Sequence, residues 1–194
     1  MKRSLNMASA LAPVLALLAC LLLPGAVFAA GTSIDTAPAE VPVGAFYNGT
    51  AITIEGSVPE GAQVVLRLSG APAEVAMKKK GKAFGLLWMN MDTVHFSGAP
   101  TVFLAQSSAP LEDLGQAGEA LGAGEKSALV EAIHIGPEGA DRAALMPEFL
   151  KLKAHEGLYR AVAEGLTLAP AQNGSQKFRA SFRLPSRLSP GVYT

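Results

Sequence analysis

The side chains with the clearest capacity for chemistry lie in one short block that runs from Met89 to His95, with Met77 upstream. Thioether and imidazole groups are ligands that select Cu(I), so Met89, Met91 and His95 are candidate ligands of a copper-handling domain. Methionine also fills irregular hydrophobic cores, and Met89 and Met91 would share one face of a strand, opposite Trp88. The residue types favour core packing for these methionines and for Trp88 over a metal site.

A second pattern begins like a zinc-protease motif and then fails. His155 and Glu156 match the start of H-E-x-x-H, but Tyr159 occupies the position of the second histidine and Gly157 interrupts the helix. The sequence contains no nucleophile elbow, phosphate-binding loop or paired-carboxylate signature. We therefore expect no catalytic residues and no cofactor, and an enzyme is the least favoured class of function.

The densest run of positive charge is Lys78-Lys-Lys-Gly-Lys82. Such a run can contact anionic lipid headgroups or an acidic partner, although a solvated hairpin is the simpler interpretation. The whole chain has 16 basic and 16 acidic residues. This lack of a basic surplus argues against nucleic acid as a partner.

The elements that position these residues follow an N-terminal export signal. Lys2 and Arg3 precede an apolar run from Leu11 to Phe28, and small residues mark a cleavage point after Ala29. The pattern predicts a signal peptide over residues 1–29 and a periplasmic protein; an uncleaved membrane anchor and lipidation at Cys20 are the alternatives. Without Cys20 the mature chain has no cysteine for disulfides or thiolate chemistry.

Residues 30–47 read as a linker, and residues 48–194 as one domain with regular β patterning. Apolar and polar residues alternate one by one within six short stretches, and these stretches recur at intervals near ten residues. Turns are expected at Lys80-Gly81, Asn90–Asp92 and Gly98–Pro100. This pattern predicts a mostly β fold, an immunoglobulin-like sandwich. The apolar positions of the expected strands are Ile52/Ile54, Val64/Leu66/Leu68, Val75/Met77, Phe84/Leu86/Trp88, Val94/Phe96 and Val102/Leu104.

Residues 111–165 break this rhythm and predict a helical insertion, with helical stretches at Glu125–Ile133 and Pro147–Glu156. Pro147 suits a first helical position and Gly157 a C-terminal cap. Leu145, Phe149 and Leu152 are expected on one buried face. Strand patterning returns at Phe178–Leu184.

The last residues, from Leu188 to Tyr193, resemble the tyrosine corner of immunoglobulin-like sandwiches, in which the tyrosine hydroxyl bonds to upstream backbone. A fold with this corner continues into a further strand. The sequence therefore predicts a domain truncated at its C-terminus, with its last strands missing. We expect Phe178–Leu184 to be the neighbouring strand that keeps an unpaired edge.

Several stretches together resemble a bacterial family called putative transmembrane protein of alphaproteobacterial type. They are Ile52-Thr-Ile-Glu-Gly56, Met77–Asn90, Asp92–Phe96, Glu156–Arg160 and Phe178–Tyr193. The resemblance covers most of residues 46–194. It implies an exported β-rich domain followed by a C-terminal membrane helix, often encoded near a sulfite-exporter-like permease. That helix is absent from these 194 residues, and no catalytic residues come with the family.

The sequence patterns and the family resemblance together predict that the protein is an exported, membrane-associated accessory or binding module without catalysis. They place it at the periplasmic face of the inner membrane. The resemblance implies an inner-membrane permease as its partner and membrane attachment through the absent helix. The alternative is a periplasmic copper-handling domain that uses Met89, Met91 and His95.

Overall fold

Strands predominate in the computed structural model of the chain, which describes residues 32–83, 86–121 and 127–194. The mostly β prediction is confirmed. The predicted signal peptide, Cys20 and the expected strand position Phe84 lie outside the described residues. The strands are β1 (Ser33–Ala37), β2 (Thr50–Pro59), β3 (Val65–Ser69), β4 (Pro72–Ala83), β5 (Leu87–Pro100), β6 (Phe103–Ser107), β7 (His134–Gly136), β8 (Tyr159–Val162), β9 (Leu166–Leu168) and β10 (Ser175–Leu184).

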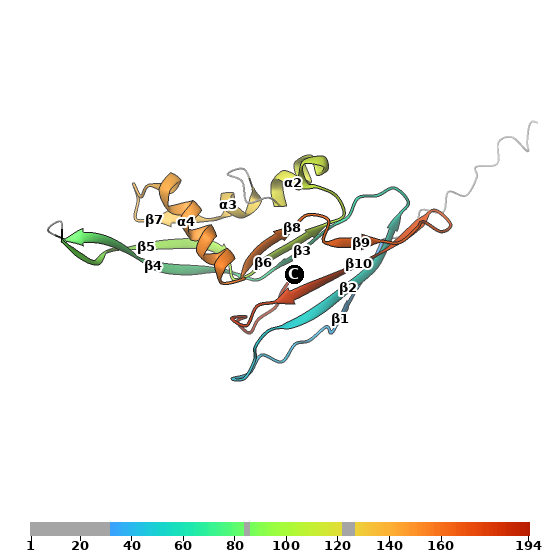
Figure 1. Cartoon of the computed structure of the whole chain (residues 1–194), viewed down its shortest axis with the longest axis horizontal. Coiled ribbons are helices and arrows are strands. Elements are labelled where there is room, and N and C mark those ends of the chain that lie inside the picture. Colours follow the sequence, from blue (N-terminus) through green and yellow to red (C-terminus); the bar gives the residue numbers. More distant parts are fainter. Residues whose placement is uncertain (1–31, 84–85, 122–126) are drawn as a thin grey trace, which may run out of the picture.

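The strands form three sheets (Figure 1). The first has the order β1-β2-β10-β9 and is antiparallel throughout. The second, β3-β6-β8, combines an antiparallel pair with the parallel pair β6–β8, and the third has the order β4-β5-β7. The parallel pair and the separate third sheet differ from the two antiparallel sheets of an immunoglobulin domain.

A single cluster of buried apolar side chains joins the three sheets and the helices. In β10, Phe178, Ala180, Phe182 and Leu184 are buried while the residues between them are exposed. This alternation places one face of the strand in the core. The same period positions the buried residues of β2, and it is the pattern that the sequence predicts for both strands.

The helices lie along one side of the molecule (Figure 1). They are the 3-10 helix η1 (Leu111–Leu114), α2 (Gln116–Leu121), α3 (Ala128–Ala132) and α4 (Arg142–His155). Phe149 of α4 is fully buried and stacks on Phe96 of β5, with ring centroids 4.2 Å apart. Arg142 donates to the carbonyls of Val130 and Ile133, both at 2.6 Å, and so ties α3 to the start of α4.

Helix α4 differs from its predicted form at its start and on its buried face. It begins at Arg142, because the Asp141 carboxylate accepts a hydrogen bond from the Ala144 amide at 3.1 Å, and Pro147 lies inside the helix. Leu152 is 37% exposed, so the predicted buried face is wrong there. The end is as predicted: Gly157, at φ 72°, follows the last turn, and the Leu158 amide bonds to the Lys153 carbonyl.

Two segments expected to lack strands contain them. Ser33–Ala37, within the expected linker, pairs with β2 along its whole length. All five of its side chains are exposed, so no apolar alternation marked it. The expected helical insertion at 111–165 includes β7 and β8 as well as helices, and β8 pairs with β6.

The chain does not turn where the sequence placed turns between residues 80 and 92. Lys80-Gly81 lies inside β4, and Asn90–Asp92 lies inside β5. The two strands pair as one long hairpin, and Met91 is the extra residue of a bulge between the pairs Lys79–Asp92 and Lys80–Asn90. The residues that suggested turns, Lys80-Gly81 and Asn90–Asp92, therefore lie at a bulge in the middle of the hairpin.

The C-terminal corner forms as predicted, but beside a different strand. The Tyr193 hydroxyl donates to the carbonyl of Ser189, and Leu188 is buried. Thr194 exchanges backbone hydrogen bonds of 2.6 and 2.9 Å with Ser69 at the end of β3. The neighbour of the final residues is thus β3; the prediction that named Phe178–Leu184 is wrong, because β2 and β9 flank β10.

Candidate functional site

The most prominent surface feature is the outer part of the β4–β5 hairpin, which projects from the molecule (Figure 1). We call Lys78–Ala83 and Leu86–Thr93 the arm. The third strand of this sheet, β7, pairs with β5 only from His95 to Ser97. The arm is therefore a two-stranded ribbon, a structure that is marginally stable unless other elements hold it.

The base of the hairpin holds the arm in place. Val75 pairs with Phe96 and Met77 pairs with Val94, so these four side chains lie on one face. Phe96 and Val94 are buried, and the stacked ring of Phe149 covers Phe96. Beyond this point the face continues outward without helix α4 above it (Figure 1).

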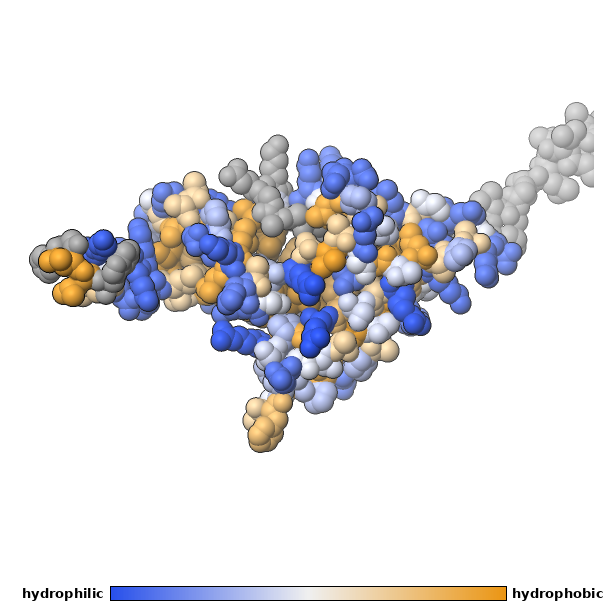
Figure 2. Space-filling model, in the orientation of Figure 1, coloured by the Kyte–Doolittle hydropathy of each residue, from blue (hydrophilic) through white to orange (hydrophobic). Residues whose placement is uncertain are grey.

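The tip of the arm exposes large apolar side chains. Leu86 is 84% exposed and Leu87 is 67% exposed, and about half of Met89 and of Met91 is exposed. Figure 2 shows hydrophobic surface at this end of the molecule, beyond a hydrophilic stretch of the hairpin. The expectation that Met89 and Met91 fill the core is wrong. The side chain of Trp88 lies outside the described residues, and its predicted burial stays a prediction.

The bulge places both methionines on one face of the arm. Met89 is the cross-strand partner of Gly81. A Cβ atom added at Gly81 would lie 2.7 Å from Cγ of Met91, so the Met91 side chain crosses over this glycine. Met89 and Met91 therefore extend the face that begins with Met77 at the base.

Lysines make the arm basic. Lys78, Lys79, Lys80 and Lys82 are all exposed, and Asp92 is the one acidic residue of the arm sequence. Lys78 donates from Nζ to Oγ1 of Thr93 at 2.9 Å, across the ribbon. Because the arm has four lysines and one acidic residue, an anionic surface would attract it.

The structure does not bring the candidate copper ligands together. His95 pairs with Ala76 and lies on the opposite face of the ribbon from Met77, Met89 and Met91. Its Nδ1 atom is 2.7 Å from Oε1 of Glu74, so a carboxylate already engages the imidazole. In the three described ranges, no three His, Cys, Asp or Glu side chains cluster as a metal site would require. We do not propose a copper site.

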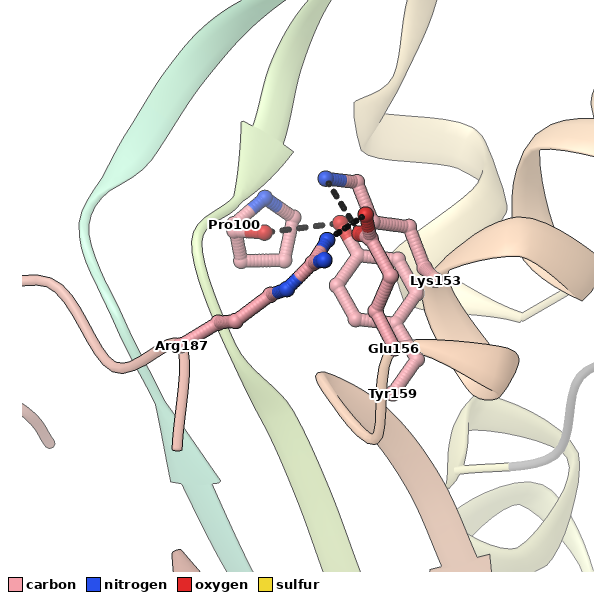
Figure 3. A network of polar contacts seen from close by, with 5 residues as sticks. All are labelled: Pro100, Lys153, Glu156, Tyr159 and Arg187. Atoms are coloured by element: carbon pink, nitrogen blue, oxygen red, sulfur yellow. Dashed lines mark hydrogen bonds and ion pairs between the residues drawn. The ribbon is translucent and has the colours of Figure 1, made fainter. Parts of the chain in front are cut away.

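A polar network at the end of α4 joins three parts of the fold (Figure 3). Glu156 accepts a hydrogen bond from Nη1 of Arg187 at 3.0 Å, and its other oxygen lies 3.5 Å from Nζ of Lys153. Tyr159, which stands where H-E-x-x-H would need its second histidine, donates from its hydroxyl to the carbonyl of Pro100 at 2.7 Å. Burial raises the pKa of the Tyr159 phenol, so it stays a neutral donor. These contacts hold elements together.

An open groove of 540 Å³ crosses the outer face of the first sheet, over β1, β2 and β10. Its charged side chains balance, and the closest pair, Glu55 and Arg179, form an ion pair of 2.6 Å. The Ser33 and Ser57 hydroxyls are 2.9 Å apart across β1 and β2. Cross-strand pairs of this kind stabilise a solvated sheet face.

Comparison with known proteins gives one match. A family model described as "Putative transmembrane protein (Alph_Pro_TM)" matches residues 32–194. The chain belongs to this family. No curated protein and no solved structure has detectable similarity to the chain.

The family match covers every strand described above, including the arm. In the same described part of the chain, no helix has both the length and the apolar character needed to cross a membrane. Sequence analysis named Lys78–Lys82 as a possible contact for anionic headgroups or an acidic partner and Met89 and Met91 as candidate ligands, but it missed the exposed tip of the arm, Leu86 and Leu87. A signal was present: apolar residues occupy Leu86, Leu87, Trp88 and Met89 in succession, which breaks the alternation of a half-buried strand beside a run of lysines.

Proposed function

We propose that the chain is an exported, membrane-associated accessory or binding module without catalysis of its own, which serves an inner-membrane transporter. The observation that carries this proposal is the arm. Leu86, Leu87, Met89 and Met91 lie exposed together at one end of the molecule. Clustered exposed apolar side chains mark a binding surface, because leaving them in water is unfavourable.

The polar groups of the fold support a binding role over a catalytic one. Glu156 forms an ion pair with Lys153 and accepts a hydrogen bond from Arg187. The Tyr159 hydroxyl donates a hydrogen bond to the Pro100 carbonyl. Glu55 and Arg179 engage each other. Each of these pairs connects elements of the fold, whereas a catalytic group must be available to a substrate.

Two finer features belong to the same proposal. Residues 1–29 act as a signal peptide that delivers the domain to the periplasmic face of the inner membrane. The domain is an immunoglobulin-like sandwich modified by the parallel pair β6–β8 and by the third sheet. Two observations support the sandwich assignment: the hydrophobic core that the sheets share, and the hydrogen bond from the Tyr193 hydroxyl to the Ser189 carbonyl.

Fractionation of cells tests the proposed function. The chain, expressed with its own N-terminal segment in a Gram-negative host, should stay with the membranes when osmotic shock releases the periplasmic contents. The double variant Leu86→Ser/Leu87→Ser should bind the membranes about 100-fold more weakly or more weakly still, and most of it should be released, because it loses the apolar contacts of two leucines. Phe46→Ser is the matched control: Phe46 is fully exposed but lies outside the arm, and this variant should behave as the parent.

Either of two outcomes would contradict the proposal. Parent protein released in full by osmotic shock would rule out membrane association. Parent protein protected from protease in spheroplasts would rule out export.

A further inference from the structure

The chemistry of the arm changes in layers from its tip toward its base. Leu86 and Leu87 stand at the tip. Met89 follows opposite Gly81, then Lys80 opposite Asn90, and Lys78 opposite Thr93 nearer the body. Lys82 pairs with Trp88, between the positions of Leu87 and Met89, so the leucines stand at the tip and the lysines begin one residue behind it.

The spacing of these layers fits the edge of a lipid bilayer. Three residues separate the Ala83–Leu87 pair from the Lys80–Asn90 pair along β4, which is roughly 10 Å at the rise of a β-strand. The polar interface on each side of the hydrocarbon core is about 5–8 Å thick. Lysine stems are long enough to bring their ammonium groups to headgroup level while the leucines lie deeper.

We propose that the arm binds an anionic lipid bilayer directly and tip first. Leu86 and Leu87 enter the boundary of the hydrocarbon core, and Lys78, Lys79 and Lys80 contact the phosphates of anionic lipids. This inference rests on the proposed membrane association and names the lipid itself, in place of a membrane protein, as the ligand of the arm.

Charge and shape favour lipid over a protein groove. The arm sequence contains four lysines and one acidic residue. A bilayer rich in anionic lipid offers the complementary charge over its whole surface. The lysines also lie on both faces of the ribbon: Lys78 and Lys80 are on the face of Ala76, and Lys79 is on the face of Met77. A planar headgroup layer around the inserted tip contacts both faces at once, whereas a groove that binds one face of a strand pair does not.

Vesicle co-sedimentation tests the inference with protein-free lipid. The full chain should bind vesicles of phosphatidylcholine mixed with phosphatidylglycerol, and bind phosphatidylcholine alone weakly. Each lysine near an anionic surface strengthens binding about fivefold, so Lys79→Gln/Lys80→Gln should weaken binding to the mixed vesicles about 25-fold. Leu86→Ser/Leu87→Ser should weaken it about 100-fold or more, because burial of a leucine is worth about 1.5–3 kcal/mol.

Two controls separate the arm from the rest of the chain. Lys151→Gln/Lys177→Gln removes the same charge from exposed positions outside the arm and should leave binding unchanged. All variants share residues 1–29, so any contribution of that segment is equal among them. Since every substituted side chain is exposed, thermal melting should match the parent.

The outcomes distinguish this inference from the proposed function. Tip-dependent retention on cell membranes without binding to the mixed vesicles would overturn the lipid inference and identify a membrane protein as the partner. Equal loss of binding in the two lysine variants would show general attraction of charge and would also overturn it. Failure of both the cell and the vesicle experiments would overturn both proposals.

Discussion

Phe149→Ala should unfold the domain or leave it only marginally folded. The Phe149 ring is fully buried, stacks on Phe96 with centroids 4.2 Å apart, and meets the ring of Tyr159 edge-on at 6.1 Å. Removing a buried phenylalanine ring typically costs about 3–5 kcal/mol, and the free energy of unfolding of a whole domain is about 5–15 kcal/mol. Chemical denaturation followed by circular dichroism measures the loss.

Leu152→Ala on the same helix is the matched control for this prediction. Leu152 is 37% exposed, so its truncation removes fewer buried contacts and should cost about 1 kcal/mol or less. Equal losses in the two variants would contradict the claim that the Phe149–Phe96 stack anchors the base of the arm.

Gly98→Ala should also destabilise the domain strongly, by about 2–4 kcal/mol. Gly98 has φ 76°, a left-handed conformation that costs alanine about 1–2 kcal/mol. In addition, the new Cβ would lie 2.3 Å from the carbonyl oxygen of Ala132, the last residue of α3. Because that atom belongs to the backbone, the helix would have to move, and with it the buried Ile133.

Gly139→Ala isolates the backbone part of this cost. Gly139 has φ 84°, yet no heavy atom lies within 4 Å of the position that a new Cβ would take. Its substitution should cost only the strain of the left-handed conformation, about 1–2 kcal/mol. If thermal melting gives the two variants the same loss, α3 does not approach β5 as closely as described.

Strands with one buried face could be predicted from the sequence because their period of two is local. The alternation in β10 from Phe178 to Leu184 needs no knowledge of its partners. The exposed strand β1 could not be found this way, because Ser33–Ala37 is held by backbone pairing with β2. Its own side chains show no alternation.

Turns and helix starts depended on context that the sequence does not contain. Lys80-Gly81 resembles a turn, but in the folded chain Gly81 provides the space over which the Met91 side chain crosses. Pro147 resembles a first helical residue, but Asp141 caps α4 earlier. Glycine and proline each occur in several kinds of local structure, and in both places the sequence prediction chose a kind that the folded chain does not have.

The candidate site was the hardest feature to predict. Apolar residues such as Leu87 and Met89 in a strand indicate burial, and their exposure follows only from where the third strand ends. Because β7 pairs with β5 no farther out than His95, and α4 covers the base alone, the outer ribbon stays uncovered. That boundary is a property of the tertiary fold.

The fluorescence of Trp88 tests most directly whether the arm enters the bilayer. Trp88 is the only tryptophan of the chain, and it follows Leu87 in β5. Burial in the protein core, which the sequence predicts for Trp88, and insertion of the arm give opposite results. If the arm inserts, we expect the emission of Trp88 to shift to the blue and to be quenched by mixed vesicles that contain brominated acyl chains, and Leu86→Ser/Leu87→Ser to abolish both effects. Unchanged emission of the parent chain under conditions where it co-sediments with the vesicles would contradict insertion of the tip.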